Sequence, residues 1–340
     1  MKDLFCIILA GGIGSRFYPL SNNNEPKQFL DFFNEKESLI QKTYKRVSKF
    51  IKDENIYILT NKNYLKLTIK HLKKIPKKNI LCEPQKKNTA ASIAYGSFTI
   101  HKKNHNAKIL VCPSDHLIEE DEKFQSTCIN GFDYLNKNKQ ILTIGIKPTK
   151  AHTGYGYIKT KKSISKKITI VEQFKEKPDE KKAVKFFKSK NYLWNSGMFI
   201  FTSIQIINEF KIHQKKTHDL FKKILTDENF DINTCFSNLK NISFDYAILE
   251  KSKNISVIKS NLKWNDLGSY SSLYSEMKKN KLKNAANSRD VKTINSKNNL
   301  IILPTGKKLI VNGLNNYIIA EKSNTLLIYP MEKDQEIGNL

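Results

Sequence analysis

Short apolar runs alternate with longer amphipathic segments through the first part of the chain, and this alternation limits the fold more than any other feature. The runs have the length of strands, whereas the segments at 38–51 and 89–103 carry apolar residues three and four positions apart, as helices do. This order predicts the α/β class, with a Rossmann-like mixed, mainly parallel sheet flanked by helices. Such sheets bind ligands at the carboxyl ends of their strands. The runs are LFCIILA (4–10), NIYILT (55–60), KKNILCE (77–83), AKILVCPSD (107–115) and ILTIGI (141–146).

The chain changes character near residue 284. Beyond it, short β-rich runs are separated by turns of Asn, Gly and Lys, which is typical of a small all-β domain. We therefore predict a large domain at 1–284, a linker within KKNKLKN (278–284) and a small β-rich C-terminal domain at 285–340. The β-rich runs are NLIILP (299–304), KKLIVNG (307–313), NNYIIAE (315–321) and NTLLIYP (324–330).

The formal charge of +27 raises the question of nucleic-acid binding. Almost all of the positive residues are lysines scattered along the 340 residues, and aromatic-interleaved basic patches that could stack bases are missing. We expect no specific nucleic-acid partner. The chain has no apolar stretch of membrane-spanning length and no N-terminal signal segment, so we also expect no membrane contact and a cytoplasmic location. The five separate cysteines form no metal-binding pattern and are expected to be buried thiols.

A glycine-rich stretch, LAGGIGSRFYPLSNNNEPKQFL (9–30), follows the first predicted strand. A dinucleotide-binding GxGxxG motif would need glycine where Phe17 stands, and a P-loop would need lysine soon after Gly14. Glycines in such a turn expose backbone N–H groups that can hold phosphates. A plain structural turn is the alternative for the glycines alone, and Arg16 and Lys27 favour the phosphate site.

This stretch resembles the signature of sugar-1-phosphate nucleotidyltransferases, and its PKQF ending resembles the mannose-1-phosphate guanylyltransferase branch. Seven further blocks follow in the order of that family, so the resemblance covers most of the chain and implies the nucleotidyltransferase fold. The blocks are EPQKKNTAASIA (83–94), VCPSDHLI (111–118), GYGYIK (154–159), FKEKPD (174–179), WNSGMFIF (194–201), FDYAILEK (244–251) and WNDLGSY (264–270).

The resemblance implies transfer of GMP from GTP to mannose 1-phosphate, with release of pyrophosphate. The attacking phosphate oxygen is already an anion, so the reaction needs cations and positioning rather than a general base. The resemblance assigns Mg²⁺ to Asp115 and Asp266, and contacts with the reacting phosphates to Arg16 and Lys27. An aspartate after a strand is otherwise often a helix cap. We expect a structural role for His116.

The resemblance also divides the binding residues into two sets. The nucleotide set contains the loop residues, Lys27 and Asp115, together with three residues near the base, for which a strand end and a helix cap are the alternative. The sugar set comes from three later blocks. The nucleotide residues are Gly11, Gly12, Gly14, Ser15, Arg16, Lys27, Glu83, Asn88, Thr89 and Asp115, and the sugar residues are Gly156, Glu176, Lys177 and Asn195.

Three alternatives remain open at the level of sequence. The chain is a nucleotidyltransferase for another sugar 1-phosphate or another base, a non-catalytic nucleotide-sugar-binding regulator, or a basic nucleic-acid-binding module. Retention of both aspartates with both loop cations argues against the last two. Some family members continue into an isomerase domain, and because the chain ends at Leu340 we expect a single activity. GTP and mannose 1-phosphate are the expected ligands, and a homodimer is one candidate assembly.

Overall fold

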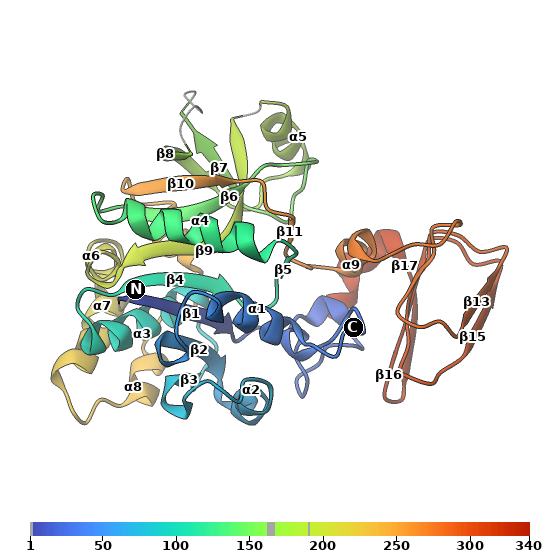
Figure 1. Ribbon diagram of the computed structural model, residues 1–340, viewed down its shortest axis with the longest axis horizontal. Helices are drawn as coiled ribbons and strands as arrows, with labels where there is room; N and C mark the ends of the chain where they lie inside the picture. The colour runs from blue at the N-terminus through green and yellow to red at the C-terminus, as the bar shows by residue number, and fades with distance from the viewer. Residues whose placement is uncertain (1–2, 162–166, 190) are drawn as a thin grey trace. The chain divides into compact units, whose positions relative to one another are not determined.

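The computed structural model describes residues 3–161, 167–189 and 191–340. Two compact units emerge from the packing, and each is assembled from separate stretches of chain (Figure 1). The first unit contains Met1–Gly11, Thr43–Ser114 and Ile118–Trp264, and the second contains Gly12–Lys42, Asp115–Leu117 and Asn265–Leu340. The glycine-rich stretch therefore belongs to the same unit as the β-rich end of the chain.

A nine-stranded sheet forms the frame of the first unit, in the order β3-β2-β1-β4-β9-β6-β10-β8-β7. The first four of these strands run parallel to one another, as the apolar runs predicted. Their carboxyl ends lie at one edge, where the chain leaves each strand for a loop. These strands are β1 (Leu4–Ala10), β2 (Ile56–Asn61), β3 (Ile80–Glu83) and β4 (Lys108–Pro113).

The other half of the sheet corrects the prediction of a mainly parallel arrangement. Strand β9 (Tyr192–Thr202) pairs antiparallel with β4, β6 and β7, and β8 pairs antiparallel with β7 and β10. Because β9 also pairs with β7, the five strands β9-β6-β10-β8-β7 close into a ring. A strand buried on both faces has the same apolar pattern in either direction, so the sequence did not reveal this. The remaining bounds are β6 (Ile141–Ile146), β7 (Tyr157–Thr160), β8 (Ile168–Lys175) and β10 (Ile255–Ser260).

Helices cover both faces of this sheet, as predicted. In α3 (Asn88–Lys103), a side chain at Gly96 would meet Ile7 on one face of the sheet. In α4 (Asp121–Tyr134), a side chain at Gly131 would meet Ile200 and Ile258, which lie in β9 and β10. Both glycines therefore allow a helix to lie close to the sheet. The other helices are α1 (Leu39–Ser48), α2 (Leu65–His71), α5 (Glu180–Lys188), α6 (Ser203–His213), α7 (Lys215–Thr226) and α8 (Ile232–Ser237).

In the second unit, the β-rich end of the chain coils upon itself. Ala285 pairs in parallel with Leu300, and Leu300 with Ile318, so successive turns of the coil take 15 and 18 residues. The Asn284 side chain accepts hydrogen bonds from Asn299 of the next turn, and Asn299 in turn accepts one from the Tyr317 N–H. These buried amides satisfy the backbone between the turns. The strands are β12 (Ala285–Ala286), β13 (Val291–Ile294), β14 (Leu300–Ile302), β15 (Leu309–Asn312), β16 (Tyr317–Lys322) and β17 (Thr325–Pro330).

Two helical segments, α9 (Tyr270–Glu276) and the terminal η7 (Met331–Asn339), complete this unit. The short strands β5 (Leu117–Ile118) and β11 (Trp264–Asn265) lie where the chain passes from one unit to the other. The predicted β-rich region is thus present, and β12 begins at the residue predicted to start it. A domain boundary at residue 284 stays a prediction.

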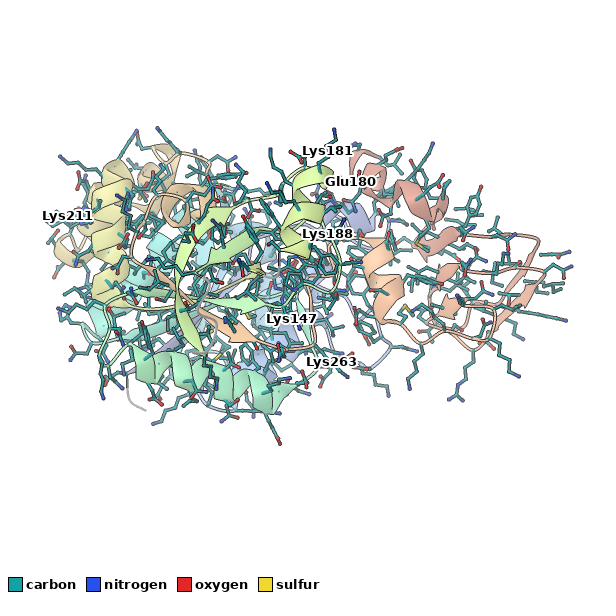
Figure 2. All side chains as sticks on the ribbon, turned by 90° about the horizontal axis from the view of Figure 1, so that it is seen from above. Lys147, Glu180, Lys181, Lys188, Lys211 and Lys263 are labelled. Atoms are coloured by element: carbon teal, nitrogen blue, oxygen red, sulfur yellow. The ribbon has the colours of Figure 1, made fainter. Side chains whose placement is uncertain are left out.

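Lysines point into solvent from separate elements of the first unit, as Figure 2 shows for the labelled lysines of the loops, α5 and α6. Lys147, Lys181, Lys188, Lys211 and Lys263 are all exposed. The five cysteines are free thiols, and all but the half-buried Cys82 are buried, as expected. Across the described residues, no helix combines the length and the apolar character needed to cross a membrane.

Candidate active site

The glycine-rich stretch forms a tight turn in the second unit, and Gly14 is the residue that it requires. Gly14 has a φ of 75°, a left-handed conformation that other residues adopt at a cost. A Cβ atom on Gly14 would also lie 2.4 Å from the Cβ atom of Lys27. Any side chain at position 14 would therefore push Lys27 away, so the turn and the lysine depend on each other.

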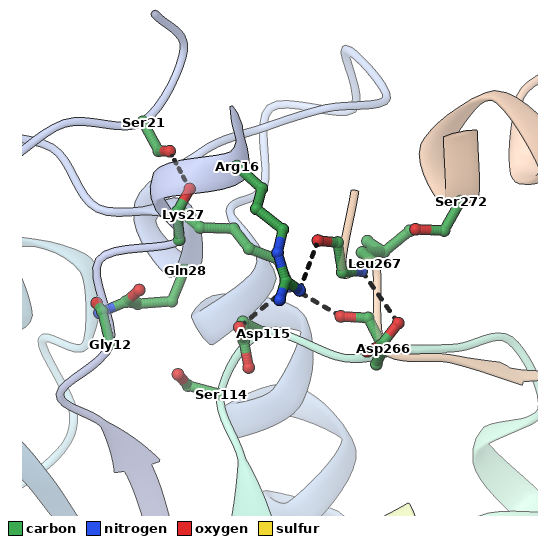
Figure 3. A network of polar contacts seen from close by, with 12 residues as sticks. Gly12, Arg16, Ser21, Lys27, Gln28, Ser114, Asp115, Asp266, Leu267 and Ser272 are labelled. Atoms are coloured by element: carbon green, nitrogen blue, oxygen red, sulfur yellow. Dashed lines mark hydrogen bonds and ion pairs between the residues drawn. The ribbon is translucent and has the colours of Figure 1, made fainter. Parts of the chain in front are cut away.

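The carbonyl groups of this turn are all engaged. Lys27 N–H donates to the Ile13 carbonyl at 2.9 Å, the Gln28 amide donates to the Gly12 carbonyl at 3.0 Å, and the Ser21 hydroxyl donates to the Gly14 carbonyl (Figure 3). The N–H groups of Gly12, Ile13 and Gly14 have no partner among the described residues. Backbone donors held in this way suit an anionic ligand.

Residues from the end of the chain hold the turn in place. The Tyr270 hydroxyl donates to the carbonyls of Phe17 and Tyr18 at 3.1 and 3.2 Å. Lys322 of β16 donates to the Leu20 carbonyl and forms an ion pair with Glu25 at 2.7 Å. The coil and α9 therefore support the loop directly.

Lys27 lies between Asp115 and Asp266 and contacts both. Its side chain is only 5% exposed, yet its ammonium donates to the Asp115 carboxylate at 2.9 Å and to the Asp266 carbonyl at 2.7 Å. A buried ammonium is retained only when it is paired and hydrogen-bonded, and both conditions hold here. The structure thus brings together three of the four predicted catalytic residues, as Figure 3 shows.

Asp115 stays ionised because of these neighbours. Burial would raise the pKa of its carboxyl group, but the charges of Lys27 and His116 and the hydrogen bond from Lys27 outweigh burial and lower the pKa. His116 therefore contributes its charge to the site. The structural role expected for His116 stays a prediction.

Asp266 and Arg16 meet at Gly268. The Asp266 carboxylate accepts a hydrogen bond from the Gly268 N–H at 2.9 Å, and the exposed Arg16 guanidinium donates weakly to the Gly268 carbonyl at 3.4 Å. Leu267 between them has a φ of 46°. Left-handed backbone at a leucine is costly, so the surrounding structure must stabilise this turn. Such strained residues are common at functional sites.

The donor set of this unit fits Mg²⁺. Asp115 and Asp266 are both half-exposed and supply carboxylate oxygens, the hard donors that Mg²⁺ prefers. No group of three or more His, Cys, Asp or Glu side chains in the described chain could hold a metal ion by itself. Mg²⁺ usually takes only one or two carboxylates and completes its shell with water and phosphate oxygens, so two aspartates are sufficient.

Glu83, at the carboxyl end of β3 in the first unit, is buried and incompletely hydrogen-bonded. Its side chain is 5% exposed, and no partner of Oε1 lies among the described residues. Burial raises the pKa of this carboxyl group to about 7, against a smaller lowering by Ser92. Gly11 follows β1 beside it, and a Cβ atom there would lie 3.3 Å from Glu83 Oε2. Glu83 Oε1 is therefore a buried acceptor without a partner among the described residues.

Four predicted residues from two different sets line one pocket of about 490 Å³ in the first unit. Asn88 and Thr89 come from the nucleotide set, and Glu176 and Lys177 come from the sugar set. The segments 241–243 and 245–246 complete the lining. Thr89 also has a structural task, since its hydroxyl accepts a hydrogen bond from the Phe244 N–H at 2.8 Å. Asn88 and Lys177 both have positive φ, of 66° and 42°.

Glu176, Gly156 and Asn195 lie close together. A Cβ atom on Gly156 would lie 2.4 Å from Glu176 Oε2 and 3.3 Å from the Asn195 Cβ atom, so a side chain there would displace the Glu176 carboxylate. The Glu176 side chain is 11% exposed and pairs with the exposed Lys177 at 3.4 Å. Burial raises the pKa of Glu176, Lys177 lowers it, and the charge of Glu250 raises it further.

Comparison with known proteins gives a consistent result. Residues 5–283 match the family model described as nucleotidyl transferase. The chain belongs to the nucleotidyl transferase family. A mannose-1-phosphate guanylyltransferase of Salmonella muenchen is 33% identical over 99% of this chain and 72% of its own length. The α/β fold is that of the family.

Two solved structures extend the comparison. A Thermus thermophilus protein described as mannose-1-phosphate geranyltransferase matches with a TM-score of 0.90 at 22% identity, over 99% of this chain and 98% of that chain. A Helicobacter pylori protein described as mannose-6-phosphate isomerase matches with a TM-score of 0.63 at 26% identity, over 77% of this chain and 99% of that one. The first covers the β-rich coil of this nucleotidyltransferase as well as its sheet.

Two carboxylates of the pocket region were missed by sequence reasoning. Asp245 lines the pocket beside Glu176, and Glu250 accepts a hydrogen bond from the Glu176 N–H at 3.3 Å. Both residues lie in the block FDYAILEK, whose residues were assigned no role from sequence. The signal was present, because two acidic residues occur five positions apart in an otherwise apolar segment.

Proposed function

We propose that this nucleotidyltransferase transfers GMP from GTP to α-D-mannose 1-phosphate and releases pyrophosphate. The observation that carries the proposal is the buried Lys27 ammonium, held by the Asp115 carboxylate and the Asp266 carbonyl beside a turn with unpaired N–H groups. The name of the Salmonella muenchen relative, of which this chain spans 72%, supports the choice of mannose 1-phosphate and GTP.

The proposed reaction makes a bond between a sugar phosphate oxygen and the α-phosphorus of GTP while the bond to pyrophosphate breaks. The nucleophile carries its own negative charge, so no residue needs to remove a proton. The N–H groups of Gly12, Ile13 and Gly14 would bind the triphosphate oxygens. Lys27 and Arg16 would stabilise the charge that moves to the leaving group.

Asp115 and Asp266 are the residues that would hold Mg²⁺. When bound, the ion neutralises the triphosphate and orients it for in-line attack. Lys27 would then exchange part of its interaction with Asp115 for the incoming phosphates.

The pocket lined by Glu176 and Lys177 would hold the sugar phosphate. Glu176 would accept hydrogen bonds from sugar hydroxyls, the Asn195 amide and the Gly156 N–H would add donors, and the exposed Lys177 would meet the phosphate. Glu83, Asn88 and Thr89 are the residues that would lie near the purine.

A substrate matrix tests the proposal. Four nucleoside triphosphates are combined with mannose, glucose and fucose 1-phosphates, pyrophosphate release is followed, and products are identified by mass. We expect the highest efficiency for GTP with mannose 1-phosphate. A clear preference for another pair would support the reaction type but contradict the proposed substrates. If no pair released pyrophosphate, the proposed activity would be refuted.

The similarity to the Helicobacter pylori protein described as mannose-6-phosphate isomerase favours isomerisation of mannose 6-phosphate as a second candidate. The same preparation is therefore incubated with mannose 6-phosphate. Ketose formation would add this activity, and its absence would leave nucleotidyl transfer alone.

A further inference from the structure

The side-chain amide of Asn195 is fixed from both ends. Its Oδ1 atom accepts hydrogen bonds from the Thr143 hydroxyl and the Gly197 N–H, both at 3.2 Å. Its Nδ2 atom donates to Asp245 Oδ1 at 2.9 Å. Since donors face the oxygen and an acceptor faces the nitrogen, the amide has one favourable orientation. One N–H of Nδ2 is used by Asp245, and the second has no partner among the described residues.

Asp245 is itself held rigidly. It begins the π-helix η6 (Asp245–Leu249), a rare conformation that is frequent at functional sites. Phe244 before it is fully buried in the core and has its N–H bound to Thr89, and Ala247 and Ile248 after it are also fully buried. The Asp245 carboxylate therefore cannot move far from Asn195, and it lines the pocket of about 490 Å³.

The charges around Asp245 are mostly negative. Glu176 comes from the end of β8, and Glu250 follows η6 and contacts the Glu176 backbone. The positive group near this pair is Lys177, whose side chain is 61% exposed. Burial, together with the charge of Glu176, raises the pKa of Asp245 to about 7. The charge of the pocket therefore changes near neutral pH.

We propose that Asp245 is a positioning residue of this enzyme, which orients the Asn195 amide toward the sugar phosphate. The inference rests on the proposed function, because it takes a sugar 1-phosphate as the ligand of this pocket. Protonated Asp245 still accepts from Asn195 through Oδ1 and adds no charge. Ionised Asp245 keeps the hydrogen bond but repels the anionic ligand.

The experiment compares Asp245→Asn, Asp245→Ala, Asn195→Ala and the double variant Asn195→Ala with Asp245→Ala, and Asp133→Asn on the exposed face of α4 serves as the control. KM for mannose 1-phosphate, KM for GTP and kcat are measured from pH 6 to pH 9. Circular dichroism checks folding. Binding of mannose 1-phosphate and of glucose 1-phosphate to the wild type is measured by calorimetry before the variants are made.

We expect Asp245→Ala to raise KM for mannose 1-phosphate about tenfold at every pH, with kcat and the KM for GTP within about twofold of wild type. In wild type, the KM for mannose 1-phosphate should rise above pH 7 as Asp245 ionises. Asp245→Asn should have the wild-type KM at pH 6 and should lack most of this rise. The sugar phosphate itself also ionises in this pH range, but it does so equally in the assays of wild type and variant. Its ionisation therefore does not affect the difference between their KM values. The double variant should be no worse than Asn195→Ala, because Asp245 acts through that amide.

Several results would overturn the proposal. They are a wild-type sugar-phosphate KM in folded Asp245→Ala, an unchanged pH profile in Asp245→Asn, or additive losses in the double variant. If Asp245→Ala does not fold, the pH profile of Asp245→Asn decides. Calorimetric binding of a sugar phosphate without GDP-mannose formation would refute the proposed substrates while leaving the test of Asp245 intact, and no binding of either sugar phosphate would refute both.

Discussion

Lys27 is buried beside a carboxylate of opposite charge, whereas Asp245 is half-buried near a carboxylate of the same charge. In the first case the charges of Lys27 and His116 outweigh burial and lower the pKa of Asp115, so this carboxyl group stays ionised. In the second case the charges oppose each other, and ionisation depends on pH. The enzyme thus contains one pair, Lys27 and Asp115, whose charges cancel before a ligand binds. In the other pair, Asp245 and Glu176, the total charge depends on pH.

Removing the charge of Asp266 tests the first group with the largest expected effect. Asp266→Asn keeps an acceptor for the Gly268 N–H, so the turn should fold, but the anionic ligand for Mg²⁺ is lost. We expect turnover to fall by about a thousandfold, and EDTA should have the same effect on wild type. Pyrophosphate release is measured at limiting Mg²⁺. Asp290→Asn, an exposed aspartate of the same unit, is the control, and full activity of Asp266→Asn would remove the residue from the mechanism.

Lys27→Ala tests the positive half of that group. Turnover should fall by about a hundredfold, because the ammonium acts where charge moves in the reaction. Lys27→Arg should restore only part of the rate, since the side chain packs against Gly14 and the guanidinium has a different shape. Single-turnover rates with saturating substrates are the measurement, and Lys292→Ala on exposed β13 is the control. A wild-type rate for Lys27→Ala would make the loop a structural turn.

Glu176→Ala tests the second group. Loss of hydrogen bonds between a carboxylate and sugar hydroxyls costs about 1.5–3 kcal/mol, or roughly ten- to hundredfold in kcat/KM for mannose 1-phosphate. Binding of GTP alone, measured by calorimetry, should change little. Glu172→Ala, an exposed glutamate of β8 shortly before Glu176, is the control. If GTP affinity collapses while the dependence on sugar phosphate stays normal, Glu176 belongs to the nucleotide side.

Glu83 extends the comparison to stability. Its pKa of about 7 in the folded protein exceeds the ordinary value, so the folded state binds more protons than the unfolded state between about pH 4.5 and 7. Wild type therefore loses stability as pH rises through this window, by about 3 kcal/mol at most, whereas Glu83→Gln does not. Urea unfolding at pH 5 and pH 8 measures the difference. An equal advantage of the variant at both pH values would contradict the assignment.

The parallel half of the sheet was predictable because its strands are continuous apolar runs that end in loops. LFCIILA corresponds to β1 without a shift, NIYILT (55–60) differs from β2 by one residue, and segment 89–103 lies within α3. The position of β9 in the sheet was not predictable, since burial on both faces removes any mark of direction. The parallel coil was also hidden, because its turns differ in length and share only a single Asn near the start of each strand, at positions 284, 299 and 316.

The loop part of the candidate site could be anticipated from local sequence, because Gly14 and Lys27 lie 13 positions apart on one turn. The pocket could not. Asn88, Glu176 and Asp245 reach it from distant parts of the chain, and the two carboxylates acquire unusual pKa values only through burial beside one another. A sequence shows the acidic residue, whereas the fold decides whether its charge is opposed or supported.

Phe17 and Leu20 of the glycine-rich stretch share an apolar core with Ile318 and Leu327 of the coil and with Ile337 of η7. The ribosome makes a protein from its N-terminus, so the loop residues leave it long before these partners exist. Until residues 300–337 have been synthesised, Phe17 and Leu20 have only part of their core to pack into. On a growing chain the sheet of the first unit can therefore fold early, whereas the loop becomes ordered only after the coil has been translated.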